Sequence, residues 1–297
     1  MSIPAAYLGV VLIWSTTPLA IQWSTQGTDF AFAVFLRMLI GCLLAATLVA
    51  AWRIGLPLHS RARRAYLVGG LSLFVAMSLT YWGARHIHSG LVSLIFGLAP
   101  LLTGLFARYW LPGQPLHRHE LLGAGLGVGG LALIFAAGRQ IGDELFIHGL
   151  LALLAATAIY SAGLVGLKRI GDDSPPLATT LGTLAVALPL FGLLWLHESG
   201  GDWALPPARS LAAIVYLGVF GSVLGFALYY YVIKHLAAAR VALITLITPV
   251  LALLLGHWLN GEEIGLRIAA GTALVLGGLL LHQWPQLQRS LRPAAAR

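Results

Sequence analysis

The chain has 297 residues, of which 59% are hydrophobic and only 9% are Asp, Glu, Lys or Arg. Soluble proteins carry roughly 25% charged residues, and a soluble fold of this size cannot bury so much apolar surface. The mean hydropathy is +0.86. This composition excludes a soluble enzyme, a disordered chain and a secreted disulfide scaffold, and it predicts an all-α, polytopic membrane protein.

The formal net charge is +8, and the basic residues lie in short gaps between apolar runs. Such gaps set orientation in a membrane, so we expect no nucleic-acid partner. The single cysteine, Cys42, lies within an apolar run and excludes an internal disulfide or a cysteine metal site. The first residues lack a basic leader and continue as long as a span, which argues against a signal peptide.

A helix needs about 20 apolar residues to cross the hydrocarbon core of a bilayer. On this basis we predict ten membrane-spanning helices, with no linker long enough for a soluble domain. In chain order they cover about 4–23, 30–52, 65–84, 87–110, 120–138, 147–168, 176–197, 209–233, 237–259 and 266–284.

The distribution of Lys and Arg predicts how these spans are oriented. If the N-terminus is cytoplasmic, the inner loops and the C-terminal tail carry 13 basic residues, and the outer loops carry 4. Cytoplasmic loops are enriched in Lys and Arg, so we expect both termini on the cytoplasmic side of a bacterial inner membrane. Most tryptophans fall near predicted span ends, as in aromatic belts.

The two halves of the chain resemble each other at a spacing of 148 or 149 residues. The aligned segments are 81–87 with 230–236, 100–102 with 249–251, and 110–111 with 258–259; at a spacing of 146, 14–15 aligns with 160–161. Five spans in each half is an odd number, so the segments 1–142 and 143–297 would enter the membrane in opposite senses. Inverted repeats of this kind are typical of secondary transporters, which work by alternating access.

Several motifs make the chain similar to the EamA type of the drug/metabolite transporter superfamily. They are Trp14-Ser15 in the first span, Arg37 near the start of the second, Pro100-Leu101-Leu102 in the fourth, and Gly261-Glu262 before a glycine-rich last span. The resemblance implies export of amino acids or similar small metabolites from the bacterial cytoplasm. The family often has an acidic residue after the fourth span, where this chain reads Pro112-Gly113-Gln114-Pro115. This departure argues against a symmetric pair of carboxylates.

Arg37 is the only basic residue well inside a predicted span. It lies about seven residues, or roughly 10 Å, from the outer end of its helix. A cation there must face a cavity, a partner or the interface. One interpretation is a docking charge for a substrate carboxylate; the other is a structural arginine that bonds backbone carbonyls or snorkels outward. No acidic residue lies in a predicted span, which disfavours an antiporter for cationic drugs and favours zwitterions or anions.

Two prolines at mid-span, Pro100 and Pro249, are candidates for the substrate cavity. Each frees a backbone carbonyl four residues earlier, at Phe96 and Thr245. Free carbonyls at membrane depth line cavities or find donors in neighbouring helices. The alternative is a plain kink that improves packing.

Aromatic and hydroxyl side chains provide further candidates. Substrate contacts are predicted for Trp14, Ser15, Tyr160 and Ser161, although serines can instead bond their own helix. Tyr81 is expected near the outer rim of the membrane and Tyr230 near the inner rim, where they would form either two gates or an aromatic belt, and the belt is the simpler interpretation.

We expect a small-molecule substrate and the lipid bilayer as partners, with no cofactor and no metal, in a monomer or a homodimer. Proton coupling would need another titrating group, and His257 is nearest to a span interior. Other cargo (drugs, nucleotide sugars or lipid-linked intermediates) and a non-transport structural or receptor role remain open. No nucleophile–base arrangement stands out, so an enzyme is not expected.

Overall fold

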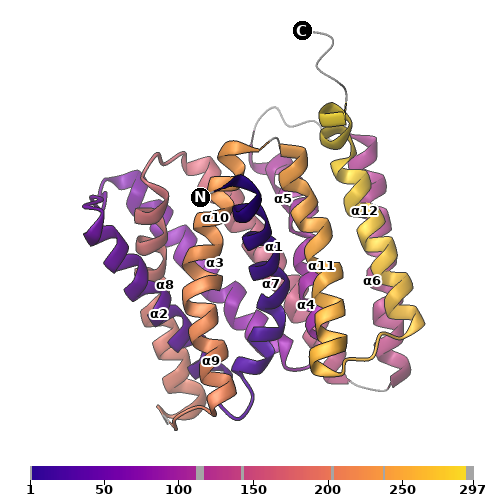
Figure 1. Ribbon diagram of the computed structural model, residues 1–297, viewed down its shortest axis with the longest axis horizontal. Coiled ribbons are helices and arrows are strands. Elements are labelled where there is room, and N and C mark those ends of the chain that lie inside the picture. The colour runs from indigo at the N-terminus through magenta and orange to yellow at the C-terminus, as the bar shows by residue number, and fades with distance from the viewer. Residues whose placement is uncertain (1, 112–116, 142–143, 202–203, 237, 292–297) are drawn as a thin grey trace.

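The computed structural model describes residues 2–111, 117–141, 144–201, 204–236 and 238–291, and this part of the chain is helical with no strand (Figure 1). The helices of the first half are α1 (Ile3–Ser24), α2 (Phe30–Ala51), α3 (Ser60–Ala84), α4 (Ser89–Gly97), α5 (Ala99–Trp110) and α6 (Arg118–Ile141). Those of the second half are α7 (Glu144–Ile170), α8 (Pro176–Ser199), α9 (Ala208–Tyr216), the π-helix η1 (Leu217–Leu224), α10 (Gly225–His235), α11 (Ala238–Asn260) and α12 (Leu266–Leu291). The predicted boundary between 142 and 143 lies outside the described residues.

Among the described residues, ten helical segments are long and apolar enough to cross a membrane, which confirms the predicted all-α, ten-span architecture. Length and hydropathy suffice to find these spans because each must stay apolar over the thickness of the hydrocarbon core and satisfy its own backbone hydrogen bonds there. The third helix starts earlier than predicted, at Ser60, since the Nδ1 atom of His59 accepts a hydrogen bond from the Ala62 amide and caps the extra turn. Asp29 caps α2 in the same way through the amides of Ala31 and Phe32.

Two spans are not regular α-helices. The fourth span breaks at Leu98 into α4 and α5, and Pro100 stands in the first turn of α5 rather than inside a continuous helix. The eighth span contains the π-helix η1 between α9 and α10. π-Helical turns are rare and cluster at functional sites, so both irregular segments mark positions to inspect.

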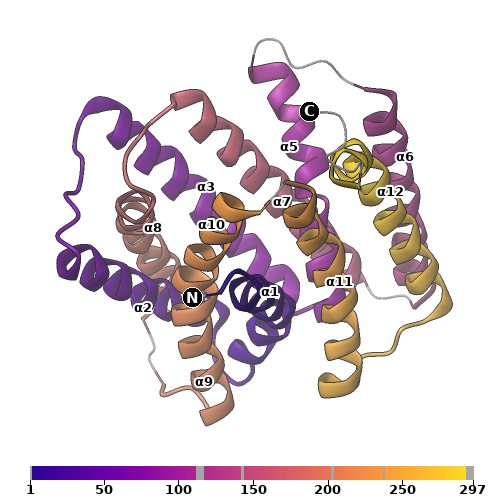
Figure 2. The same cartoon turned by 45° about the horizontal axis from the view of Figure 1, so that its top comes forward.

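The helices pack in a bundle whose neighbours often come from different halves of the chain. α3 packs on α7, α1 packs on α10 and α11, and α2 contacts both α8 and η1. α6 and α12 lie together at one edge of the molecule (Figures 1 and 2). A Cβ atom added to Gly130 would come within 2.5 Å of the Gly271 carbonyl, so these two helices approach as closely as small residues allow.

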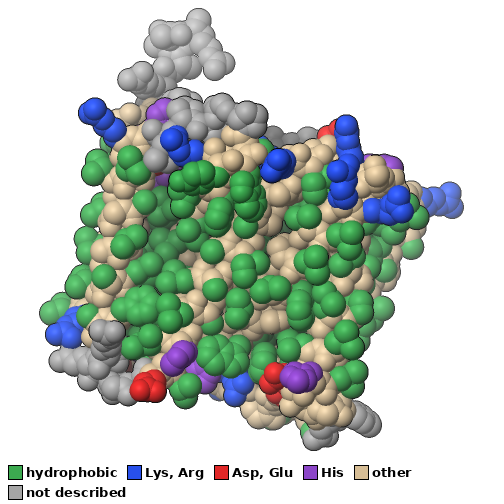
Figure 3. Space-filling model, turned by 180° about the vertical axis from the view of Figure 1, so that it is seen from behind, with side chains coloured by type: hydrophobic (Ala, Val, Ile, Leu, Met, Phe, Trp, Pro, Cys, Tyr) green, Lys and Arg blue, Asp and Glu red, His purple; other side chains and the backbone are tan. Residues whose placement is uncertain are grey.

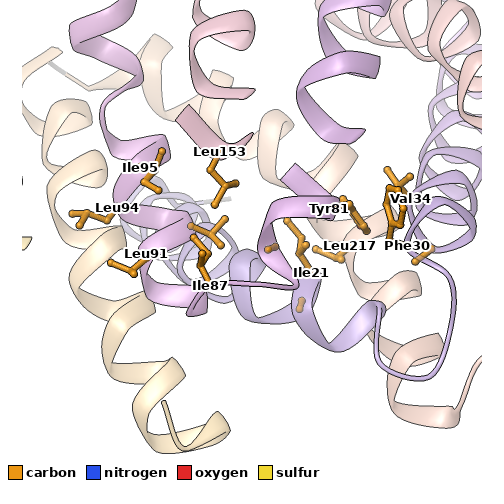
Figure 4. Packing of buried hydrophobic residues seen from close by; sticks show 14 of the residues in the cluster. Ile21, Phe30, Val34, Tyr81, Ile87, Leu91, Leu94, Ile95, Leu153 and Leu217 are labelled. Carbon is orange, nitrogen blue, oxygen red and sulfur yellow. The ribbon is translucent and has the colours of Figure 1, made fainter. Parts of the chain in front are cut away.

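The start of α1 and the end of α12 lie at the same end of the bundle, which we call the proximal end (Figure 1). The opposite, distal end carries the links 25–29, 85–88, 204–207 and 261–265 (Figure 1). In the face shown in Figure 3, most Lys and Arg side chains lie along the proximal edge. Buried apolar side chains in the distal half form part of the main core, among them Ile21, Phe30, Ile87, Leu91 and Leu217 (Figure 4).

Candidate functional site

Arg37 is buried inside the bundle, with only 6% of its surface exposed. Its Nε atom donates to the Ser222 hydroxyl over 3.2 Å, and Nη1 donates to the Tyr81 hydroxyl over 3.4 Å. Arg37 forms no ion pair, and its Nη2 atom has no protein acceptor, within the described part of the chain. A guanidinium carries five N–H donors, so several donors of a buried cation are unused by the protein.

The π-helix is what brings Ser222 to this arginine. The Ser222 hydroxyl donates to the Leu217 carbonyl five residues earlier, which is the spacing of a π-turn. α2 and η1 approach closely here, because a Cβ atom on Gly218 would lie 2.6 Å from the Ile40 side chain. Ser222 was not predicted as a site residue, because the apolar and glycine-rich sequence of 217–224 gives no indication of a π-turn.

Tyr81 lies in the core and not in an aromatic belt, so the simpler interpretation of this residue was wrong. Its surface exposure is 0%, and its side chain lies near Phe30, Val34 and Leu217 (Figure 4). The Arg37 guanidinium carbon is 5.9 Å from the centre of the Tyr81 ring, which allows a cation–π contact as well as the hydroxyl bond. Burial is tolerated because the hydroxyl has this polar partner.

On α1, Trp14 packs against two aromatic residues of α10. Its ring centre is 4.6 Å from that of Tyr229 and 6.3 Å from that of Phe226. Ser15, by contrast, donates to the Val11 carbonyl of its own helix, as the alternative interpretation proposed. One turn beyond Trp14, Thr17 lies close to Gly221 in η1, which connects this aromatic cluster to the surroundings of Arg37.

The counterpart residues of α7 lie beside the helix break in the fourth span. Tyr160 meets the ring of Phe96 edge-on at 6.2 Å between centres. Ser161 is fully buried and donates to the carbonyl of Ala99 over 3.2 Å. The carbonyl beside Pro100 that receives a side-chain donor is therefore that of Ala99, whereas the sequence analysis had singled out Phe96.

Pro249 and Thr245 of α11 face the same break from the other side. A Cβ atom on Gly97 would lie 3.5 Å from the Pro249 ring and 3.9 Å from the Thr245 carbonyl. The Thr245 hydroxyl accepts a hydrogen bond of 2.8 Å from the buried Gln283 amide, a residue that the sequence analysis missed. The side chain of Tyr230 lies outside the described part of the structure, so its predicted role stays a prediction.

Comparison with known proteins identifies the family. Residues 2–136 and again 147–282 match the EamA-like transporter family. The chain belongs to the EamA family. The two consecutive matches cover nearly all of its length, and the family consists of transporters.

Curated relatives match over most of both chains. The uncharacterized transporter YvbV of Bacillus subtilis is 27% identical over 92% of this chain and 88% of its own length. The uncharacterized inner membrane transporter YedA of Escherichia coli is 25% identical over 98% and 96%. A probable terminal-alkyne amino-acid exporter of Streptantibioticus cattleyicolor is 25% identical over 92% and 91%.

A solved structure, titled only as the crystal structure of a protein, shares this fold. It is 23% identical, covers 96% of this chain and 99% of its own, and superposes with a TM-score of 0.65. The fold of this EamA protein therefore also occurs in a protein whose crystal structure has been solved.

Proposed function

We propose that this EamA transporter exports small metabolites that carry a carboxylate, amino acids or related zwitterions and anions, across the bacterial inner membrane. The observation that carries the proposal is Arg37, a buried cation with unused donors and no acidic partner in the described part of the chain. A buried charge of this kind is costly unless an anion joins it, and a carboxylate matches the fork of a guanidinium. One relative at 25% identity is named a probable amino-acid exporter, which supports this cargo class.

We infer that the remaining candidates shape the cavity around the cargo. Trp14 with Tyr229, and Tyr160 with Phe96, would offer aromatic walls, and the backbone around Pro100 and Pro249 would offer carbonyl acceptors for an amino group. The two family matches support an internal duplication into inverted halves, and rocking of these halves would expose the cargo to each side in turn. The excess of Lys and Arg at the proximal end supports cytoplasmic termini.

The test is release of a loaded metabolite mixture from liposomes that contain the purified protein, measured by mass spectrometry against empty liposomes. We expect selective release of amino acids or related anions. Arg37→Gln should slow release of carboxylate cargo at least tenfold, because a charged pair in a low-dielectric site is lost. Arg64→Gln, at an exposed proximal position, is the matched control and should release cargo at the wild-type rate.

A folding defect and a binding defect are separated by a second cargo. The carboxamide analogue of each released acid lacks the negative charge, so wild-type protein should prefer the acid and Arg37→Gln should lose that preference. If the preference for the acid survives in Arg37→Gln, Arg37 does not bind the carboxylate. If folded wild-type protein releases none of these solutes, the cargo class is wrong.

A further inference from the structure

The distal end holds a buried acidic residue that transport of a carboxylate does not use. Glu262 follows α11 in the link to α12, yet only 7% of its surface is exposed. Its Oε2 atom accepts a hydrogen bond from the Ser89 hydroxyl at the start of α4, over 3.1 Å. Its Oε1 atom accepts from the Asn260 amide over 2.9 Å. Glu262 forms no ion pair within the described residues, so neutral donors alone hold this carboxylate.

Asn260 extends these bonds to α1. Its Nδ2 atom also donates to the Gln22 carbonyl oxygen over 3.1 Å, and its Oδ1 atom accepts from the Trp23 indole over 3.2 Å. The Gln22 amide in turn donates to the backbone carbonyls of Ala84 and Ile87, at the end of α3 and before α4. We call Gln22, Ser89, Asn260 and Glu262 the distal latch, since they join α1, α3, α4 and α11 at one end of the bundle.

Residues of the distal latch adjoin both a polar pocket and the apolar core. A polar pocket of about 360 Å³ is lined by Gln22 and Asn260 of the latch together with Thr25, Gln26, Ala84 and Arg85. Ile21, Ile87 and Leu91, which lie within two residues of Gln22 or Ser89 in the chain, are packed in the apolar core (Figure 4). Gln22 and Asn260 thus line the pocket, whereas Ser89 and Glu262 are buried.

The latch has no counterpart in the other half of the chain. At the spacings that relate the halves, Asn260 and Glu262 correspond to Pro112 and Gln114, and Gln22 corresponds to Lys168. Ser89 corresponds to an alanine, at 237 or 238. The proximal end therefore lacks the residues for the same set of bonds, although the helices that would carry them are repeated.

We propose that the distal latch holds the distal end of the transporter shut and biases the resting protein toward the state that is closed on that side. This inference rests on the proposed function, because it assigns the latch to one gate of an alternating-access cycle. Opening the distal end must separate α1 from α11, and this separation breaks the bonds of Asn260 to Gln22 and Trp23. A cargo that binds from the other side then supplies the free energy for opening.

The test measures access from the distal side to a residue beneath the latch. Ser93 is buried on α4, about one turn below Ser89, and Ser93→Cys places a thiol there. In a background with Cys42→Ala, this is the only thiol of the chain. A membrane-impermeant maleimide is applied to right-side-out vesicles and, separately, to everted vesicles. We expect slow labelling from the distal side, and roughly tenfold faster labelling when Gln22→Leu or Asn260→Asp removes latch bonds.

Gln26→Leu provides a matched control. Gln26 lines the same pocket four residues after Gln22, and its side chain makes no hydrogen bond in the described structure. This variant should label at the rate of the Ser93→Cys parent. Equal labelling of Gln22→Leu, Gln26→Leu and the parent, in protein that remains monodisperse by size-exclusion chromatography, would overturn the latch.

The labelling assay is independent of cargo, so the two proposals fail separately. If no solute is released by wild-type protein but Gln22→Leu speeds distal labelling, the cargo proposal fails and the latch stands. If cargo is released normally and latch variants label no faster, the cargo proposal stands and the latch fails. Faster labelling only in everted vesicles would reverse the proposed orientation while keeping the latch.

Discussion

Two buried carboxylates, one at each end of the bundle, are held in opposite ways. At the distal end both oxygens of Glu262 accept hydrogen bonds from Ser89 and Asn260. At the proximal end, Asp172 lies in the link between α7 and α8 with 5% of its side chain exposed, and neither oxygen has a hydrogen bond in the described structure. Its nearest partner is the Nε2 atom of His59 at 3.6 Å, on a side chain that is 57% exposed.

The difference shows that a buried carboxylate does not by itself hold helices together; it does so only where it accepts hydrogen bonds from them. Glu262 accepts hydrogen bonds from Ser89 of α4 and Asn260 of α11, so removing its carboxylate leaves both donors without an acceptor. Asp172 bears the cost of desolvation with little compensation, and its contact with His59 is an ion pair only while the imidazole is protonated. We therefore expect the two ends to respond differently to the same substitution.

Glu262→Ala should give the largest change in stability. It leaves the Ser89 hydroxyl and one Asn260 N–H without an acceptor, which costs about 2–4 kcal/mol and lowers the melting temperature by about 5–10 °C. Thermal unfolding in detergent, followed by fluorescence-detected size exclusion, measures it. Glu263→Ala removes the exposed neighbouring carboxylate and should change the melting temperature by less than about 2 °C.

Asp172→Ala should have a smaller effect of the opposite sign. It removes a desolvated charge that makes no hydrogen bond, so the melting temperature should stay the same or rise by about 1–3 °C. Asp173→Ala, at the exposed neighbouring position, is the control. A drop comparable to that of Glu262→Ala would show that the two carboxylates are held alike and would break the comparison.

His59→Asn should give the smallest change. Asparagine keeps a side-chain acceptor for the Ala62 amide at the start of α3 but cannot pair with Asp172 as a cation. An ion pair with a largely exposed partner contributes about 0–1 kcal/mol, so the variant should lose less than about 2 °C in melting temperature. A larger loss would point to a weakened cap of α3 rather than to the lost ion pair.

The sequence alone predicts the spans and singles out Arg37 as a charge inside one of them, and the physical reason is the same for both. Crossing lipid imposes a length and a composition on each helix, so a span or a misplaced charge stands out without any knowledge of its neighbours. The family resemblance, drawn from weak motifs spread over the chain, is confirmed by the two matches to the EamA-like family.

What the sequence does not predict depends on contacts between distant segments. From the sequence, Glu262 is assigned to a loop between two spans. Its burial cannot be predicted there, because only the fold brings α4 and α1 close to that loop. Tyr81 reads as an interfacial tyrosine, because the partner that permits its burial lies on another helix. A mid-span proline does not determine the local structure by itself. The fourth span breaks at Leu98, two residues before Pro100, whereas α11 continues as one helix through Pro249.

The π-helix in the eighth span has a consequence for comparing this chain with its relatives. A π-turn accommodates one residue more than an α-turn, so a relative with a straight eighth helix should align with a single-residue gap within 217–224. Without the extra residue, the side chain at the position of Ser222 rotates by about 100° and points away from the second helix. The presence or absence of that gap thus sorts EamA proteins into those that present a hydroxyl to the arginine and those that do not.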